Sequence, residues 1–116
     1  MTIKIIKDSV SKAELKMIAS QQFGDLVKAV VDVNQEIMAI GAELHADEEV
    51  ALMEQENSER ENTWGINLYP DKTGNEFMEF DSMVNIKPAF GNRSCDVQNR
   101  EIREKIKTIV KKLVTE

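Results

Sequence analysis

The chain has 116 residues, of which 41% are hydrophobic and 31% are charged, and its formal net charge is −6. This length predicts one domain over residues 1–116 with a hydrophobic core of its own. No apolar run approaches the roughly 20 residues that cross a bilayer, so a transmembrane helix is excluded. The single cysteine, Cys95, excludes an internal disulfide framework. The lysine-interrupted N-terminus does not match a signal peptide, so we expect a cytoplasmic protein without a membrane partner.

Charge is unevenly distributed along the chain. Residues 25–62 contain eleven acidic and two basic residues, whereas residues 82–116 contain eight basic and four acidic ones. An acidic protein is repelled by phosphate backbones, so nucleic acid is not expected as the main partner. The opposite charges of the two segments favour a protein partner, or a homo-oligomer such as a homodimer.

The N-terminal part predicts a strand followed by a helix. Residues 3–6 are rich in isoleucine and form the expected first strand. Ser11 and Glu14 have the spacing of a capping box, which predicts a helix from there to about Gln22. Gly24 then suits the left-handed conformation that ends many helices.

A β-hairpin and an acidic helix are expected next. Residues 26–33 and 37–42 are two nearly continuous apolar runs, and Asn34-Gln35 between them supplies turn chemistry. The acids at 47–49 fit the first turn of a helix that continues to about Met53, because they complement its positive end. Residues 54–62 contain no apolar side chain and predict a solvated helix end or a mobile loop.

The C-terminal half predicts three strands and a last helix. Residues 63–69 alternate apolar and polar side chains, which is typical of a strand. Two shorter strands are expected at 76–80 and 83–87, followed by a polar loop at 89–98. Asn99 can cap a final helix with an apolar stripe that ends at Leu113. The element order indicates one α+β domain, with a mainly antiparallel sheet of five to six strands and its helices packed on one face.

The only histidine, His45, is the first candidate for chemistry, because imidazole titrates near neutral pH and ligates metals. If the chain stays extended after Ala42, the side chains of Glu43, His45 and Asp47 point to the same side. These three could then hold a divalent metal, with Asp81 or Glu48 completing the set. His45 and Asp81 are also candidate catalytic residues. In the competing interpretation His45 merely ends a strand, and the acids after it begin a helix.

A second candidate site lies in the polar segment after the predicted strand at 83–87. Asn85, Asn92, Arg93 and Ser94 place amide, guanidinium and hydroxyl groups close together around a glycine-containing loop. Such groups could bind a small anion, for example a phosphate or a carboxylate. The same residue types are also what a wide loop between a strand and a helix requires.

Several segments resemble a family of small prokaryotic proteins of unknown function. They are FGDLVKAVVD at 23–32, GAELHADEE at 41–49, WGINLYPD at 64–71, FDSMVNIKP at 80–88 and GNRS at 91–94. The resemblance covers nearly the whole chain and implies a stand-alone prokaryotic protein. It carries over no catalytic residue.

The absence of a complete catalytic signature favours a non-catalytic module that binds a ligand or a protein. The alternative is a small metal-dependent or acid/base enzyme that uses His45 with neighbouring carboxylates. No cofactor is predicted, and a divalent metal belongs only to that alternative. Whether the protein is an enzyme stays open at this point.

Overall fold

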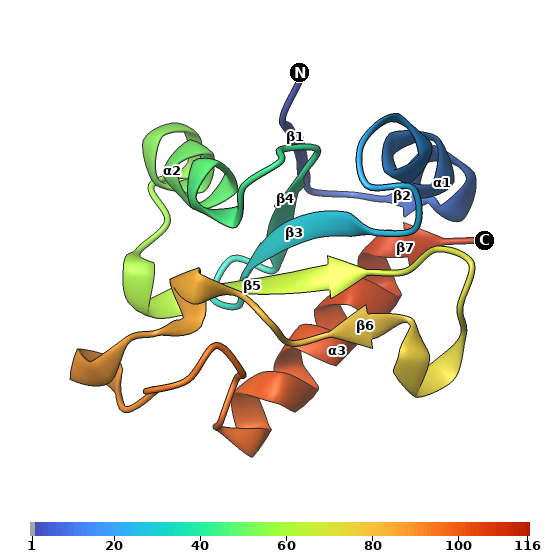
Figure 1. The fold of residues 1–116 in the computed structure, drawn as a ribbon. Coiled ribbons are helices and arrows are strands. Elements are labelled where there is room, and N and C mark those ends of the chain that lie inside the picture. Colours follow the sequence, from blue (N-terminus) through green and yellow to red (C-terminus); the bar gives the residue numbers. More distant parts are fainter. Residues whose placement is uncertain (1) are drawn as a thin grey trace.

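A five-stranded antiparallel sheet forms the centre of the computed structural model, which describes residues 2–116 (Figure 1). In spatial order its strands are β1 (Lys4–Ile6), β4 (Ile37–Ile40), β3 (Val27–Asp32), β5 (Thr63–Leu68) and β6 (Met78–Glu79). The helices are α1 (Lys12–Gln21), α2 (His45–Glu56) and α3 (Arg100–Leu113). A short parallel pair joins β2 (Val10–Ser11) to β7 (Val114–Thr115). The α+β class and the five-stranded antiparallel sheet are thus confirmed.

Local sequence signals explain the elements of the N-terminal half. The Ser11 hydroxyl accepts a hydrogen bond from the Glu14 amide at 3.1 Å, which caps α1. Gly24 has a φ of +93° and donates to the Ala19 carbonyl, as expected after a helix end. The turn between β3 and β4 is held by the Asp32 carboxylate, which accepts from the amides of Asn34 and Gln35 at 2.8 and 3.0 Å.

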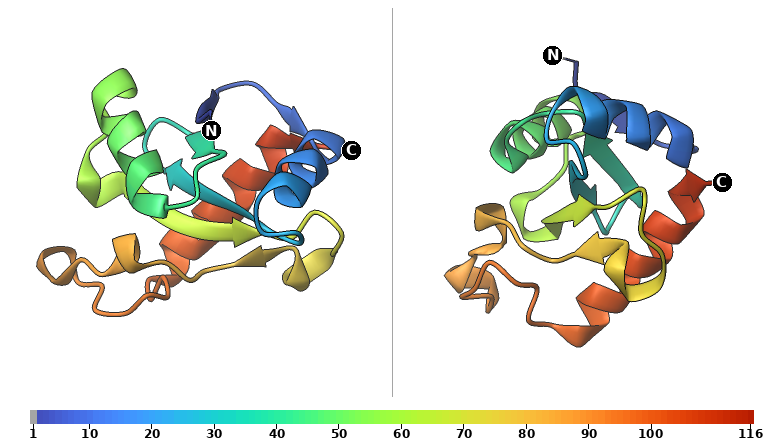
Figure 2. Two further views of the ribbon diagram at one scale, coloured as in Figure 1. Left: turned by 45° about the horizontal axis from the view of Figure 1, so that its top comes forward. Right: turned by 45° about the vertical axis from the view of Figure 1, so that its right-hand side comes forward.

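The helices do not all lie on one face of the sheet, and this part of the expectation was wrong. Leu15 and Ala19 of α1 pack with apolar side chains of α3 on the sheet face formed by Val31 and its neighbours. Leu52 of α2 packs instead with Val30 on the opposite face. The strand alternation explains the difference, because β3 is buried on both faces and each face needs a cover. Figure 2 shows α2 separated from α3 by the sheet.

The segment 83–87, expected to be a strand, forms a 3₁₀ turn, η3 (Met83–Asn85), instead. The Ser82 hydroxyl accepts from the Val84 amide at 3.2 Å and begins this turn. The Asn85 side chain then accepts from the Gly65 amide at 2.7 Å and donates to the Gly65 carbonyl at 2.9 Å. One side-chain amide therefore takes the place that the backbone of a neighbouring strand would occupy beside β5. Alternation in the sequence could not show this substitution.

The remaining turns connect these elements. They are η1 (Arg60–Asn62), η2 (Gly74–Glu76) and η4 (Pro88–Phe90). The solvated segment after α2 is thus a helix end followed by a short turn, one of the two alternatives expected for it. No helix in the part of the chain that the structure describes is long and apolar enough to cross a membrane.

Candidate functional site

His45 begins α2 and lies against β5. Its Nε2 is 2.8 Å from the carbonyl oxygen of Ile66. Because a carbonyl only accepts, this ring nitrogen carries the proton and donates it. Burial lowers the pKa of His45 below its ordinary value of 6.5; the hydrogen bond to Ile66 opposes that effect, and the charge of Lys28 adds to it. The fold thus favours a neutral imidazole that ties α2 to the sheet.

A row of polar side chains crosses three strands beside His45. Lys28 of β3 pairs with Asn67 of β5, which pairs with Glu79 of β6. Asn67 donates its amide protons to a Glu79 carboxylate oxygen at 2.8 Å and to the Asp81 carbonyl at 3.3 Å. Tyr69 donates its hydroxyl proton to the same Glu79 oxygen at 3.0 Å. We call Lys28, Asn67 and Glu79 the polar row; it lies on the face that α2 covers.

Asp81 follows this row and is close enough for its charge to raise the pKa of His45 slightly, against the larger effect of burial. Both candidate catalytic residues thus lie near Asn67, which donates to the Asp81 carbonyl. Asn67, 7% exposed, lies beside the imidazole, but its Oδ1 accepts no hydrogen bond. The cluster is hydrogen-bonded mainly within itself, which is typical of a polar network that fixes the packing of one helix on a sheet.

The three residues expected to hold a metal do not share one side of an extended chain. Gly41 adopts a φ of +100°, and the helix begins at His45. Glu43 and Asp47 are exposed, whereas His45 is buried. Within residues 2–116 no group of three or more histidine, cysteine, aspartate and glutamate side chains is arranged to hold a metal ion. The predicted metal site of Glu43, His45 and Asp47 required an extended chain, whereas the structure turns at Gly41 and begins a helix at His45.

Two consecutive glutamates of α2 are buried beneath the helix and have different surroundings. Glu48 is fully buried, accepts one hydrogen bond from the Ala42 amide at 3.0 Å, and has no partner for its other oxygen. Burial raises the pKa of Glu48 well above its ordinary value. Glu49 accepts from the Thr63 hydroxyl at 2.7 Å and lies 3.4 Å from the Nζ of Lys87. Burial lowers the pKa of Lys87, and the charge of Glu49 partly offsets that shift.

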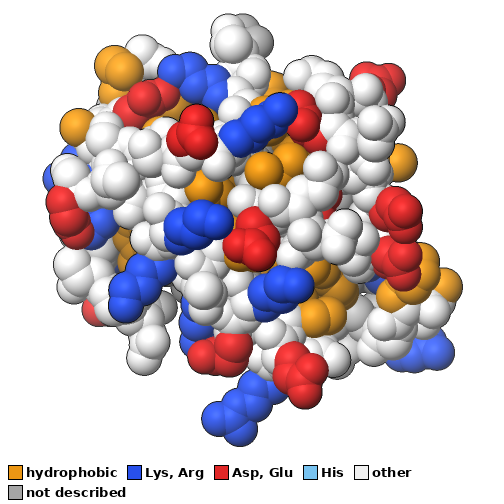
Figure 3. Space-filling view, turned by 180° about the vertical axis from the view of Figure 1, so that it is seen from behind, with side chains coloured by type: hydrophobic (Ala, Val, Ile, Leu, Met, Phe, Trp, Pro, Cys, Tyr) orange, Lys and Arg blue, Asp and Glu red, His pale blue; other side chains and the backbone are white. Residues whose placement is uncertain are grey.

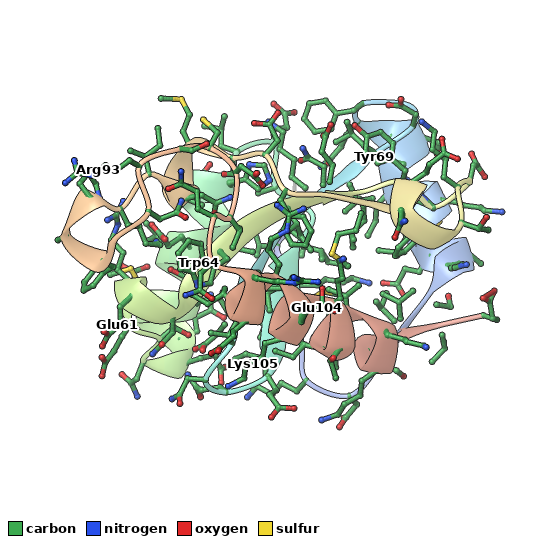
Figure 4. The ribbon with its side chains drawn as sticks, turned by 90° about the horizontal axis from the view of Figure 1, so that it is seen from below. Glu61, Trp64, Tyr69, Arg93, Glu104 and Lys105 are labelled. Atoms are coloured by element: carbon green, nitrogen blue, oxygen red, sulfur yellow. The ribbon has the colours of Figure 1, made fainter. Side chains whose placement is uncertain are left out.

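The residues expected to bind an anion mainly hold their own loop together. Asn85 and Asn92 are 0% and 2% exposed. Asn92 donates to the carbonyls of Asn85, Ser94 and Asp96 and accepts from the Gln98 amide. Arg93 is exposed, and Figure 4 places it at the outer end of the loop, on the opposite side of the molecule from Tyr69. The structure thus separates Arg93 from the polar row.

A groove that the sequence did not reveal lies between α3 and the segment that contains η2 and β6. Its volume is about 890 Å³. Its apolar lining comes from Phe77, Met78, Phe80, Val110 and Val114, and its basic lining from Lys12, Arg103, Lys107 and Lys111. Asp96, Glu116 and the polar residues 73–75 complete it. We call this the α3–β6 groove.

The basic side chains of the groove stand over its aromatic rings. The Lys12 ammonium is 5.2 Å from the centre of the Phe77 ring, and the Arg103 guanidinium is 4.6 Å from that of Phe80. Charge and apolar surface are therefore adjacent rather than separate. Figure 3, seen from behind, shows basic and acidic side chains interspersed with exposed apolar surface on the side where α3 runs. The sequence contained one sign of this groove, the basic residues at positions 103, 107 and 111 on one side of a helix. It gave no sign of the segment that forms the other wall.

Comparison with known proteins gives a family and no activity. A family model described as "Protein of unknown function (DUF5674)" matches residues 4–113. No curated protein and no solved structure matches the chain.

Proposed function

The chain belongs to this family of unknown function, and from that premise we propose that it is a non-catalytic module that binds an amphipathic anion in the α3–β6 groove. The carrying observation is the groove itself, whose volume of about 890 Å³ lies within the range of pockets that hold small molecules. Its apolar floor supports burial of an apolar body. Its basic side chains support a negatively charged end.

The charges of the groove favour an anion over a cation. Four basic and two acidic side chains line it. Arg103 contacts Asp96 at 3.0 Å, and Lys12 contacts Glu116 at 3.1 Å. None of the ion pairs among the described residues involves Lys111, so its ammonium is available to a ligand. A carboxylate, sulfonate or phosphate would gain a charge-assisted hydrogen bond there.

The contacts of His45 support the acid/base alternative less well. Its Nε2 proton is donated to the Ile66 carbonyl, and the ring is only 9% exposed. A general base must reach a substrate proton within hydrogen-bond distance. The surroundings of His45 suit a structural role. The groove is more accessible to a ligand than the imidazole is.

The location and assembly of the protein remain part of this proposal. The N-terminus that led us to expect a cytoplasmic protein, and the resemblance that implied a prokaryotic one, support an intracellular small anion or protein as the ligand. A homodimer is the form of self-association we would expect, and light scattering of the purified protein measures it directly.

Binding of anilinonaphthalene sulfonate tests the proposal, because this probe is an amphipathic anion that fluoresces in apolar surroundings. We expect saturable binding that shifts the NMR amide signals of β6 and of the second half of α3. The double variant Lys107→Glu/Lys111→Glu should weaken binding about tenfold, equivalent to about 1.4 kcal/mol. Lys105→Glu is the matched control, because Lys105 is exposed on the same helix and does not line the groove (Figure 4). Equal loss in both variants, or shifts confined to other elements, would refute the proposal.

A further inference from the structure

The strand beside the groove has an unpaired edge. β6 is the outermost strand of the sheet and pairs only with β5. Its register places Glu79 opposite Asn67 and Met78 opposite Leu68, and the Tyr69 amide donates to the Phe77 carbonyl at 2.8 Å. Hydrogen-bonded and non-hydrogen-bonded pairs alternate along an antiparallel ladder. The amide and carbonyl of Met78 therefore point away from β5, toward the outer edge of the sheet.

The side chains of β6 divide between two surfaces. Met78 lies on the side that packs against the core shared with α3 and lines the groove. Glu79, the next residue, belongs to the polar row on the opposite face. An extended chain added along β6 would thus present every second side chain to the apolar floor, since strand side chains alternate. The basic stripe of α3 would face it across the groove.

We propose that the natural ligand of the α3–β6 groove is an extended acidic peptide segment of a partner protein, which pairs with β6 as a sixth strand. This inference rests on the proposed function and specifies its ligand. The backbone of the peptide hydrogen-bonds with the amide and carbonyl of Met78. Every second side chain of the peptide faces the groove; of these, the apolar ones pack on Phe80 and Val110, and an acidic one contacts Lys107 and Lys111. Addition of a strand to a sheet edge beside a helix is an established mode of peptide recognition.

Two observations favour a peptide over other amphipathic anions. The outward edge of β6 offers both a donor and an acceptor, and an extended backbone satisfies both, whereas a lipid tail satisfies neither. The shortness of β6, only two residues, also fits a selective site, because short edge strands resist unspecific pairing and leave recognition to the side chains.

A synthetic hexapeptide with valine, glutamate and valine at its first, third and fifth positions, serine between them and both ends blocked, tests the inference, because its valines and glutamate then share one face. NMR amide signals report the binding site, and hydrogen exchange reports the Met78 amide. We expect shifts along β6 and α3, slower exchange at Met78, and an affinity reduced about tenfold when the peptide is N-methylated at alternate positions. The same peptide with lysine in place of glutamate should not bind measurably.

Variants of the protein supply the second arm. Lys111→Glu should weaken the acidic peptide about tenfold and Lys105→Glu less than about twofold. Met78→Pro removes the outward amide and leaves the side chains of α3 unchanged, so it should abolish binding of the peptide. Because both lysines are exposed, their variants keep the test valid if the proline variant does not fold.

The outcomes separate the two proposals. Equal binding of the N-methylated and unmodified peptides, or unchanged exchange at Met78, overturns strand addition. If the sulfonate probe binds in the groove and the acidic peptide does not, the inference fails and the binding function stands. If neither probe binds there, both fail.

Discussion

The two faces of the sheet are covered in different ways. The face under α1 and α3 is apolar, and its buried side chains form one continuous core. The face under α2 has a small apolar cluster and is otherwise rich in buried polar groups. They include Asp32, His45, Glu48, Glu49, Thr63, Asn67, Asn85 and Lys87. One face therefore gains stability from the apolar area removed from water, and the other depends on hydrogen bonds that require one particular arrangement.

This difference also separates structure from function. The polar face is closed by α2 and by the η3 turn, and its polar groups mostly bond to one another. The apolar face is incompletely covered at its β6 edge, where the α3–β6 groove leaves both apolar surface and charge accessible. The buried polar groups of this chain thus hold α2 in place, and the apolar face carries the proposed binding surface.

Removal of the buried ion pair on the polar face should have the largest effect. Lys87→Met leaves the Glu49 carboxylate, whose side chain is only 9% exposed, with the half-exposed Arg60 at 3.6 Å as its one basic neighbour. We expect a loss of about 3–5 kcal/mol in the free energy of unfolding. Urea unfolding followed by the fluorescence of Trp64 measures it, since the Lys87 ammonium is 5.3 Å from that ring. The double variant Lys87→Met/Glu49→Leu should recover part of the loss; no recovery would show that the pair is not the cause.

Truncation of a side chain on the apolar face should lower the free energy of unfolding slightly less. The loss there comes from apolar contacts and not from a charge pair. Ile106 of α3 is fully buried in the core. Ile106→Ala removes apolar area and leaves a cavity, which should lower the free energy of unfolding by about 3 kcal/mol. The loss should be the same at every pH from 5 to 8, because no charge is involved. Met17→Ala, at a side chain 55% exposed, is the control and should change stability by less than about 0.5 kcal/mol.

The Asn85 amide should matter next. Asn85→Ala removes the two hydrogen bonds to Gly65 and one to the Cys95 carbonyl at 2.9 Å. We expect a loss of about 2 kcal/mol, because buried backbone groups are left without partners. Faster hydrogen exchange at the Gly65 amide would confirm the cause. Asn34→Ala, at an exposed turn residue, should leave both quantities unchanged; an equal effect would contradict the role given to Asn85.

Glu48→Gln should have the smallest effect, a gain in stability that depends on pH. The raised pKa of Glu48 means that the folded protein holds this proton at pH values where the unfolded chain has released it. Between the unfolded value of 4.5 and the folded pKa, stability therefore falls as pH rises. Glu48→Gln should remove that fall and exceed the wild type by about 1 kcal/mol at pH 8.

Thermal unfolding of both proteins from pH 4 to pH 8 measures this difference, and comparing them cancels the titration of His45. Glu49→Gln is the matched control on the neighbouring position. It should lower stability at pH 8, because Glu49 is paired with Lys87 and Thr63. A Glu48 variant that loses stability at every pH would show that the carboxylate is charged in the folded protein.

Particular residues show how far the sequence could predict this fold. Ser11, Gly24 and Asn99 act as helix-end residues as their positions indicated, and Asn99 accepts from the Ile102 amide at 3.0 Å. The hairpin of β3 and β4 also follows from its two apolar runs. By contrast, the aromatic Phe23, just beyond α1, is not part of the core: it is 42% exposed and lies under the Lys28 ammonium at 5.0 Å. A residue beyond the helix end is placed by its neighbours rather than by helical spacing.

The candidate site was only partly predictable. The sequence singled out His45, and Asp81 lies close to it, but the metal ligands proposed around it depended on an extended chain that the start of α2 prevents. Asn85 and Asn92 were predicted as candidate ligands of an anion, and in the structure their side chains hydrogen-bond within their own loop and with Gly65. Side-chain type shows that a polar residue needs partners, but it does not show which ones.

The sequence by itself determined the elements whose signals are local: helix ends, the hairpin turn, and the apolar stripes of the strands and of α3. These depend on residues a few positions apart, and the physical chemistry of capping and alternation acts over that range. Only the tertiary structure decided which face each helix covers and that β6 and α3, some thirty residues apart, enclose a groove. The reason is that β3 is buried on both faces, so either face could accept a helix until the whole chain was packed.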